Sequence, residues 1–370
     1  MRGDERAQGM MFATVVLEDR IPATHPLRAL RRLVDPLLRD LSPTFAELYS
    51  GTGRPSIPPE QLLRALLLQI LYSIRSERQL VEQLEYNLLF RWFVGLDLEA
   101  SAWQATTFTK NRQRLLEGAV AAQFLARVIG VAESSQLMSR EHFSVDGTLL
   151  EAWASQKSVR PLDDDTRDRP VDPTNTGVSF HGERRTNATH GSVTDPDARM
   201  ARKSNNTASI LAYQASVLTE NRHGLVVGAI VSSPHGVAEV EDALVLLQSV
   251  PPSSGTRTVG ADKGYFATRY LDSLRRRGIK PHVACPDQPI KKKAKALREW
   301  AKRKTHSEGY AMSQRLRKLI EELFGEGKDL MGLRRMRLRT LDRVQEQPLM
   351  TALAQNHKRL VRMRQLALAG

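Results

Sequence analysis

The stretch HFSVDGTLLEAWAS, residues 142–155, decides the fold of the second half of this chain. Its first residues alternate between polar and apolar side chains, as the residues of a half-buried β-strand do. One carboxylate, Asp146, stands in the middle of this strand and is followed by a glycine and a threonine. A buried charge is unfavourable unless it is paired or binds a cation. Asp146 therefore either ends the strand in a turn or is held there as a ligand.

The sequence after this strand alternates between strand and helix patterns. Two apolar strands are expected at 207–220 and 224–233, and the NRHG between them is typical of a hairpin. Next come a helix at 239–250, a strand at 256–261, a helix at 264–279 that Gly278 ends, and a strand at 280–286. This order predicts an α/β domain.

A second carboxylate, Asp262, follows the expected strand 256–261 directly. In open α/β sheets, ligands and chemistry collect at strand ends. If the two strands are neighbours, Asp146 and Asp262 converge, and paired carboxylates suit Mg²⁺ or Mn²⁺, which prefer oxygen ligands. The alternative is that Asp262 only caps a helix and that Asp146 only ends a strand.

A third acid is expected on a helix after Tyr310, where apolar residues recur in one stripe. Arg317 and Glu321 are four residues apart and share a face of this helix. A surface ion pair is the simpler interpretation of these two residues. Glu322 is a rival for the role of third acid, and spacing alone does not choose between the two glutamates.

The first 135 residues are expected to be helical. Pro58 and Pro59 can open one helix and Ser76 can cap another. Thr106 or Thr107 can cap a third, with a basic face that carries Lys110, Arg112 and Arg114. This arrangement is similar to a helix-turn-helix, with Lys110, Asn111 and Arg114 as candidate DNA contacts. The alternative is an ordinary helical bundle with a solvated basic face.

The charge of the chain points to a polyanionic partner. Lys and Arg number 55 against 41 Asp and Glu, which gives a net charge of +14. Nucleic acid is the common partner of such a protein, although a host with generally Arg-rich proteins would give the same balance. The basic residues cluster, and the alternative for each cluster is a solvated helix face. The clusters are 291–304, with Lys291, Lys292 and Lys293; 333–339, with Arg334 and Arg335; and 357–364.

Other segments bound the organisation and the compartment. Residues 158–206 are rich in Pro, Gly, Asp, Asn and Thr, and predict a long loop with partial disorder. The only cysteine, Cys285, leaves no disulfide framework or cysteine zinc site. The sequence shows neither a signal peptide nor about 18 uncharged apolar residues in a row. We therefore expect a soluble protein of the cytoplasm, associated with the nucleoid and without membrane contact.

From His142 onward the chain resembles the insertion-sequence DDE transposases, which have an RNase H-like core. The matching pieces are FSVDGTLLEAWAS, TDPDARMARK, ENRHGLVV, GADKGYF and SQRLRKLIEELFGEGK, and the helical segment around RPSIPPEQLLRALLLQ resembles the domain that precedes this core. The resemblance implies an α/β fold with a mixed sheet flanked by helices, after an all-α domain. The implied domains are 1–135, 136–340 and a basic C-terminal helical tail, 341–370.

The resemblance also implies roles for individual residues. Asp146, Asp262 and Glu321 match the three acids that hold Mg²⁺ or Mn²⁺, as two ions. Glu321 ranks above Glu322 because it has an arginine four residues before it and a lysine seven after it. These two, Arg317 and Lys328, are expected to contact phosphate. Two departures from the family pattern are Gln314, where a tyrosine is frequent, and Glu326, where an aromatic residue is frequent and where an acid is expected to reduce activity.

The implied function is DNA transposition. Such an enzyme binds the inverted repeats of an element, cleaves phosphodiester bonds and joins 3′-hydroxyl ends to target DNA. Two ends must be cut together, so at least a homodimer on DNA is expected. Two alternatives stay open: an inactive or domesticated sequence-specific DNA-binding protein, and a metal-dependent nuclease that does not join strands.

Overall fold

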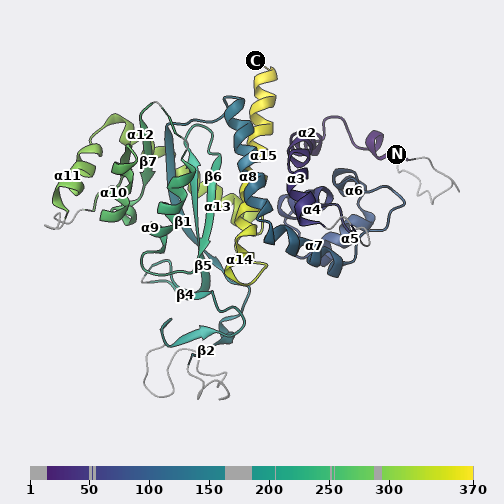
Figure 1. The fold of residues 1–370 in the computed structure, drawn as a ribbon, viewed down its shortest axis with the longest axis horizontal. Coiled ribbons are helices and arrows are strands. Elements are labelled where there is room, and N and C mark those ends of the chain that lie inside the picture. Colours follow the sequence, from purple (N-terminus) through teal and green to yellow (C-terminus); the bar gives the residue numbers. More distant parts are fainter. Residues whose placement is uncertain are drawn as a thin grey trace, which may run out of the picture.

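The structure is a computed structural model with two lobes, one helical and one built around a β-sheet (Figure 1). It describes residues 15–49, 52, 56–162, 186–204, 206–250, 252–253, 255–286 and 294–369, and side chains up to residue 366. The helical lobe is made of α1 (Leu17–Arg20), α2 (Pro26–Asp40), α3 (Ser42–Leu48), α4 (Pro59–Leu71), α5 (Glu77–Tyr86), α6 (Leu88–Val94), α7 (Ala105–Glu117) and α8 (Val120–Ser134).

Local sequence signals account for most helix starts in this lobe. Pro59 opens α4, and the Ser76 hydroxyl accepts a hydrogen bond from the Gln79 amide at the start of α5. The start of α7 differs from the expectation, because this helix begins at Ala105 without a side-chain cap. Thr106 and Thr107 therefore lie inside its first turn, and the predicted threonine cap is wrong.

The second lobe is a six-stranded mixed sheet with the strand order of an RNase H-like core. The antiparallel neighbours β1 and β5 lie at its centre, with β6 and β4 paired to β5, while β7 runs parallel to β1 and β8 parallel to β7. The bounds are β1 (His142–Glu151), β4 (Arg199–Ala201), β5 (Ile210–Glu220), β6 (Val226–Ser232), β7 (Arg257–Ala261) and β8 (Ile279–Val283). The predicted α/β fold, with an all-α region before it, is confirmed.

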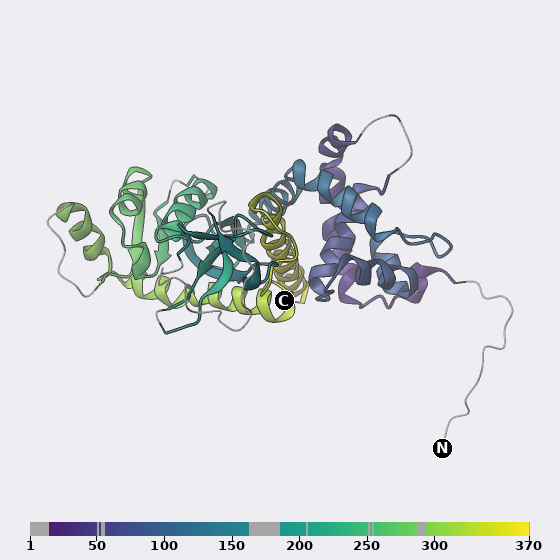
Figure 2. The ribbon, with the colours of Figure 1, turned by 90° about the horizontal axis from the view of Figure 1, so that it is seen from below.

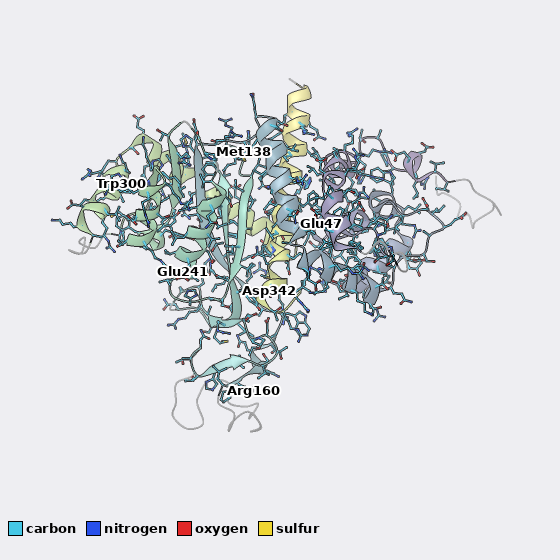
Figure 3. All side chains as sticks on the ribbon, in the orientation of Figure 1. Glu47, Met138, Arg160, Glu241, Trp300 and Asp342 are labelled. Atoms are coloured by element: carbon cyan, nitrogen blue, oxygen red, sulfur yellow. The ribbon has the colours of Figure 1, made fainter. Side chains whose placement is uncertain are left out.

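Helices cover both faces of this sheet. On one face, α9 (Ala238–Leu246) packs on β1, β5 and β6, and α10 (Thr268–Arg276) packs on β8. On the other face, α12 (Glu308–Leu316) and α13 (Lys318–Leu330) pack on β1. The outlying α11 (Lys295–Lys304) packs on α10 and β8, and its Trp300, labelled in Figure 3, is half-buried against the hydrophobic core.

The last helix lies at the centre of the molecule. After the short α14 (Leu341–Val344), α15 (Glu346–Ala369) runs beside α8 and packs on β6, α4 and α2, between the two lobes (Figures 1 and 2). Residues 349–357 are all buried, because this stretch has small, apolar and neutral polar side chains all round. The segment predicted as a basic helical tail contains a helix that packs on elements of both lobes. The domain boundaries themselves stay predictions.

A buried ion-pair network ties α15 to the helical lobe. The Arg112 guanidinium on α7 donates through Nη1 to Glu77 Oε1 at 2.7 Å and through Nε to Glu346 Oε2 at 2.5 Å. Arg112 is 5% exposed, so its expected place on a solvated basic face is wrong. Burial alone would lower the pKa of this guanidinium, but the charges of Glu346 and Glu77 outweigh burial and raise the pKa. A cation held in this way fixes α7 and α15 relative to each other.

The region 158–206 has more structure than a long loop. In its described part, β2 (Val159–Pro161) and β3 (His190–Ser192) form a two-stranded hairpin that projects below the main sheet, and β4 joins that sheet (Figure 1). Polar contacts hold this part: Asp195 accepts hydrogen bonds from the Tyr213 hydroxyl and the Thr340 amide. The predicted loop is therefore wrong for these residues, and its stretch 163–185 lies outside the described residues.

Helix length and composition bear on membrane contact. Among the helices that the structure describes, none is by itself both long and apolar enough to cross a bilayer. The pair α7 and α8, bent by 64°, reaches that length and composition only when the two helices are taken together.

We expect Arg112→Met to destabilise the protein. The substitution leaves Glu346 buried without a partner, and breaking a buried ion pair from one side costs about 3–5 kcal/mol of the free energy of unfolding. Urea denaturation followed by circular dichroism measures this loss. Arg114→Met, at an exposed site on the same helix, is the matched control and should cost less than about 1 kcal/mol. Equal losses of unfolding free energy in the two variants would show that the Arg112 ion pairs do not fix α7 relative to α15.

Candidate active site

The register of β1 and β7 brings two carboxylates to the same level. The parallel pairs are His142 with Thr258, Phe143 with Val259, and Ser144 with Gly260, after which the strands part. Asp146 and Asp262 each lie two residues beyond the last pair. The two strands are neighbours, as the interpretation of the site required, and both acids lie where the sheet opens.

Asp146 is held in β1 by two partners. Its Oδ1 accepts a hydrogen bond from the Gly147 amide at 2.8 Å, and its Oδ2 forms an ion pair with Arg317 Nη1 at 2.6 Å. Burial raises the pKa of this carboxyl, the Gly147 amide and Arg317 lower it, and the charges of Asp262 and Glu321 raise it; the net shift is upward. The arginine thus offsets only part of the cost of keeping an acid here.

Asp262 has a capping role as well as a place beside Asp146. Its Oδ1 accepts from the Gly264 amide at 2.8 Å and caps the 3₁₀ turn Lys263–Tyr265. The simpler interpretation, that Asp262 caps a helical turn, is therefore confirmed. This cap uses only one carboxylate oxygen. It leaves the second carboxylate oxygen for another partner, and the charge of Asp262 acts on Asp146.

The junction of α12 and α13 brings the third acid to this place. The Gln314 side chain donates to the carbonyls of Ala261, at 3.2 Å, and His282, at 2.6 Å, and so fastens α12 across the ends of β7 and β8. Arg317, at the junction, reaches Asp146 and lies 3.5 Å from Glu321 Oε1 through Nη2. Gln314, the residue that departs from the family pattern, thus positions the helix by binding two carbonyls.

Glu321 and Glu322 point to different surroundings. Glu321 is 60% exposed and pairs with Arg317 on the side of Asp146. Glu322 lines a cavity of about 350 Å³ between α13 and α15, together with Glu326, Lys358, Arg359 and Arg362. The charge of Glu321 is among those that raise the pKa of Asp146. The choice of Glu321 as the third acid stays a prediction.

Glu326 lies away from the candidate active site. Its carboxylate pairs with Lys358 and Arg359 and accepts from Gln355, all on α15. Burial works against ionisation, yet Lys358 and Arg359 hold the pKa of Glu326 below its ordinary value. The expected effect of this acid on activity stays a prediction. Five residues past Glu321, Glu326 points to another side of the helix.

Lys328 fastens α13 to β1. Its ammonium donates to the Thr148 hydroxyl at 2.7 Å and to the Leu149 carbonyl at 3.1 Å. Burial lowers the pKa of Lys328, and the charges of Lys203 and Arg334 lower it further. The observed contacts are with β1, so they account for a positioning role.

A fourth carboxylate, Glu239, was not singled out by sequence. It lies in the first turn of α9, where acids are frequent for the sake of the helix dipole, so its position carried no chemical signal. A Cβ atom added to Gly147 would lie 3.3 Å from one carboxylate oxygen of Glu239. A Cβ atom added to Gly264 would lie within 4 Å of both the other oxygen of Glu239 and Asp262 Oδ1. Burial, then the charges of Asp262 and Asp146, raise the pKa of Glu239.

The chemistry of this site fits a hard divalent cation. Several carboxylates raise one another's pKa, and carboxylate oxygens are the ligands of Mg²⁺ and Mn²⁺. The fully buried Tyr265 hydroxyl beside them has no hydrogen-bond partner within the described residues. Among the residues that the structure describes, no three His, Cys, Asp or Glu side chains lie close enough together to hold a metal ion in their present positions. The Arg317 guanidinium is the cation between Asp146 and Glu321 here.

The predicted DNA contacts fall into three groups. Lys110 and Arg114 are exposed on α7, but Asn111 is buried and accepts from Ser56, so it is not a surface contact. Arg334 is exposed and pairs with Asp329, and the Arg335 guanidinium binds the carbonyls of residues 152 and 153. Lys291, Lys292 and Lys293 lie outside the described residues.

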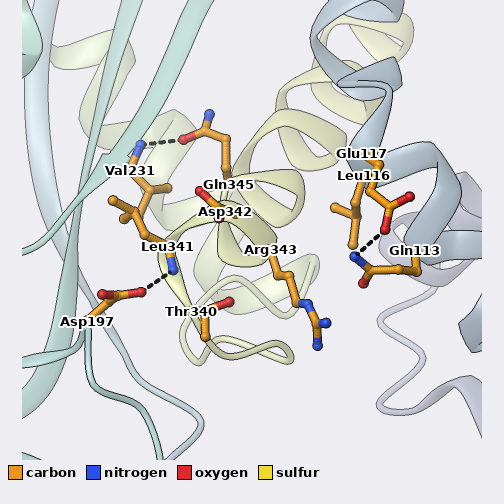
Figure 4. Close-up of a pocket in the computed structure, with 10 residues that line it drawn as sticks. All are labelled: Gln113, Leu116, Glu117, Asp197, Val231, Thr340, Leu341, Asp342, Arg343 and Gln345. Carbon is orange, nitrogen blue, oxygen red and sulfur yellow. Dashed lines mark hydrogen bonds between the residues drawn. The ribbon is translucent and has the colours of Figure 1, made fainter.

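A cavity of about 960 Å³ lies apart from the carboxylates, between α7 and α14 (Figure 4). Hydrogen bonds from the Leu341 amide to Asp197 and from the Val231 amide to Gln345 hold its walls. None of Asp146, Asp262, Glu321 and Glu239 lines this cavity. Its place between the lobes makes it a packing feature of the interface, separate from the candidate active site.

We expect Glu239→Gln to stabilise the metal-free protein at neutral pH. The raised pKa means that ionised Glu239 costs stability above its folded pKa, and that this cost vanishes below its ordinary value of 4.5. The gain at pH 7.5 should be on the order of 0.5 kcal/mol after solvent screening, and should disappear near pH 4. Thermal melts in EDTA at both pH values measure it.

Glu241→Gln, two residues along the same helix, is the matched control (Figure 3). Arg269 and His235 lower the pKa of Glu241, so its neutralisation should lower the melting temperature at pH 7.5. Changes of the same sign in the two variants would show that the carboxylate neighbours of Glu239 do not govern its effect.

Comparisons with known proteins give two family matches. Residues 139–357 match a family model described as Transposase DDE domain, and residues 15–114 match one described as Transposase domain (DUF772). A crystal structure of the Mos1 mariner paired end complex with Mn is 12% identical over 80% of this chain and 87% of its own, but its TM-score of 0.20 carries no argument. A search of curated proteins finds no match. The first match spans more than half of the chain, and the chain therefore belongs to the DDE transposases.

Proposed function

We propose that this transposase binds the terminal inverted repeats of an element, cleaves phosphodiester bonds there and joins the 3′-hydroxyl ends to target DNA. It would act as a homodimer or higher oligomer at the nucleoid, in the cytoplasm. The observation that supports this most is the placement of Asp146 and Asp262 at one level past the last β1–β7 pair, with Glu321 linked to Asp146 through Arg317.

Asp146, Asp262 and Glu321 would hold Mg²⁺ or Mn²⁺, as two ions. Such ions, when bound, activate the attacking oxygen and stabilise the leaving one. The residues of the chain prepare this. The three carboxylates supply oxygen ligands, and Gln314 and Lys328 keep α12 and α13 against the strands that carry two of them.

Arg317 is suited to exchange one anion for another. Its guanidinium binds the Asp146 carboxylate, and its Nε, although buried, has no hydrogen-bond partner among the described residues. An arginine grips a phosphate through two parallel hydrogen bonds. We therefore propose that Arg317 contacts a phosphate beside the acids. In this structure the Asp146 carboxylate occupies the place of that phosphate on the guanidinium.

The DNA would lie across exposed basic side chains of both lobes. Lys110 and Arg114 on α7, and Arg334 and Arg335 after α13, are among the exposed candidates. Each phosphate that is neutralised strengthens binding and makes it sensitive to salt. Lys291, Lys292 and Lys293 complete the proposed set on the strength of sequence alone.

We expect Asp146→Asn, Asp262→Asn and Glu321→Gln each to slow DNA cleavage by about a hundredfold or more, because a ligand charge is lost while binding of the ends is kept. The measurement uses a plasmid that carries the DNA flanking the gene, with Mg²⁺ and a target plasmid. Glu322→Gln is the matched control and should cleave normally. Loss of cleavage in Glu322→Gln but not in Glu321→Gln would make the third assignment wrong.

The same assay separates the alternatives. Joined products with 3′-hydroxyl donor ends support strand transfer. Cleavage without joined products would identify a nuclease, and end binding without cleavage would identify a DNA-binding protein that has lost catalysis.

We expect Arg317→Ala to slow single-turnover cleavage by about a hundredfold at saturating protein, the effect of losing roughly 2.7 kcal/mol from the transition state. A surface ion pair contributes at most about 1 kcal/mol and would barely affect turnover. Arg315→Ala, at an exposed site two residues earlier, is the control. A rate within about threefold of the parent for Arg317→Ala, with an intact circular dichroism spectrum, would return Arg317 to a purely structural role.

A further inference from the structure

Trp153 stands out at the end of β1. Its side chain is 49% exposed, whereas Leu150, Ala152 and Ala154 around it are at most 5% exposed. Tryptophan is highly buried on average, so an indole left half in water costs hydrophobic stabilisation. These buried neighbours hold the backbone in place, while the ring itself stays at the surface.

The turn that carries this ring is held from several sides. Arg335 donates through Nε to the Ala152 carbonyl at 3.2 Å and through Nη2 to the Trp153 carbonyl at 2.8 Å. The Glu151 amide donates to the Arg334 carbonyl, and the Ala152 amide to the Leu211 carbonyl. A ring on so fixed a backbone loses little freedom when it binds a partner, which favours binding.

The surroundings of the ring are cationic. The Arg339 guanidinium carbon lies 5.2 Å from the centroid of the Trp153 ring. Lys328 contacts β1 at Thr148 and Leu149, and Arg335 contacts the Trp153 carbonyl. Arg334 lies on the same segment, where its guanidinium pairs with Asp329. An exposed aromatic ring among cations is the composition of a platform for unpaired nucleotides, where bases stack and phosphates are neutralised.

Trp153 also lies at a set distance from the acids. It follows Asp146 by seven residues along β1 and the turn, roughly 20–25 Å at the rise of a strand. The hairpin of β2 and β3, with Arg160, projects beyond this end of the sheet (Figure 3). A strand that passes the acids toward the hairpin would meet the indole within a few nucleotides.

We propose that Trp153 is a stacking platform for an unpaired base of DNA bound at the candidate active site. The proposal rests on the proposed function for the identity of the nucleic acid. The indole receives the base, and Arg335 and Arg339 position the ring and neutralise the neighbouring phosphates.

The test measures binding of the full chain to two labelled oligomers of about 20 units by fluorescence anisotropy, in EDTA. One is oligo(dT), and the other is an abasic backbone of the same length, which keeps the phosphates and lacks the bases. Trp153→Ala should weaken oligo(dT) binding about 5- to 100-fold and change binding of the abasic oligomer less than twofold. Trp153→Phe should keep most of the oligo(dT) affinity.

Two controls make the outcome specific. Val193→Ala removes an apolar side chain that is 61% exposed in the same region, and should change neither affinity. Arg339→Ala should weaken binding of both oligomers. Both affinities are measured in EDTA, where no cleavage takes place, so a failure of cleavage and a failure of stacking are read separately.

Several results would overturn the proposal. Parent protein that binds oligo(dT) no better than the abasic backbone has no base platform. Equal weakening of both oligomers by Trp153→Ala would make the ring a structural support for the cations. A changed sedimentation coefficient with unchanged oligo(dT) affinity would assign the ring to a contact between protein chains.

Discussion

The parting of β1 and β7 after Ser144 and Gly260 is the constraint on which the candidate site depends. Parallel pairing up to that point brings Asp146 and Asp262 to one level, and the gap beyond it lets Glu239 approach from the opposite face of the sheet. Like charges at such a place raise the free energy of the folded state, and only part of this is offset by Arg317. Burial of these carboxylates, and after it their mutual repulsion, is the physical reason why the site suits divalent cations.

The elements around the gap are fastened to strands by hydrogen bonds. Gln314 ties α12 to the carbonyls at the ends of β7 and β8, and Lys328 ties α13 to β1. Between these two anchors stands Arg317, which reaches Asp146 because the helix on either side is fixed. The buried Arg112 network fixes the two lobes relative to each other, because it joins α7 to the central helix α15. Orientation is thus set by polar contacts laid over an apolar core.

Sequence patterns predicted the elements whose signals are local. The strands that became β1, β5 and β6 are apolar or alternating runs bounded by turn residues, and Gly278 stands in the left-handed region just after α10, as expected. Arg317 and Glu321 could be paired because their spacing of four is a helical spacing. The convergence of Asp146 and Asp262 required only that the two strands be neighbours.

What sequence could not predict depends on distant partners. Arg112 is like its exposed neighbours in sequence, and only Glu346, 234 residues away, makes its burial possible. Residues 195–201 lack apolar periodicity, and the buried contact between Asp195 and Tyr213 supplies the order instead. Glu239 is an ordinary first-turn acid until α9 is laid beside the gap in the sheet. In each case, one residue's partner is chosen by the tertiary fold.

The distances between residues along β1 are fixed, because one continuous segment contacts this strand along its length. Residues 317–335 meet β1 at Asp146, at Thr148 and Leu149, and at Glu151, in the same order as they follow along the chain. Any shift of β1 relative to α13 would break all of these contacts at once, since each depends on the same register. The separation between the acids and Trp153 is therefore set by the rise of a β-strand and not by the motion of a loop. On the proposed function, a base platform held in this way would select DNA by the number of nucleotides between the cleaved bond and the stacked base, because the acids and Trp153 are fixed on one strand.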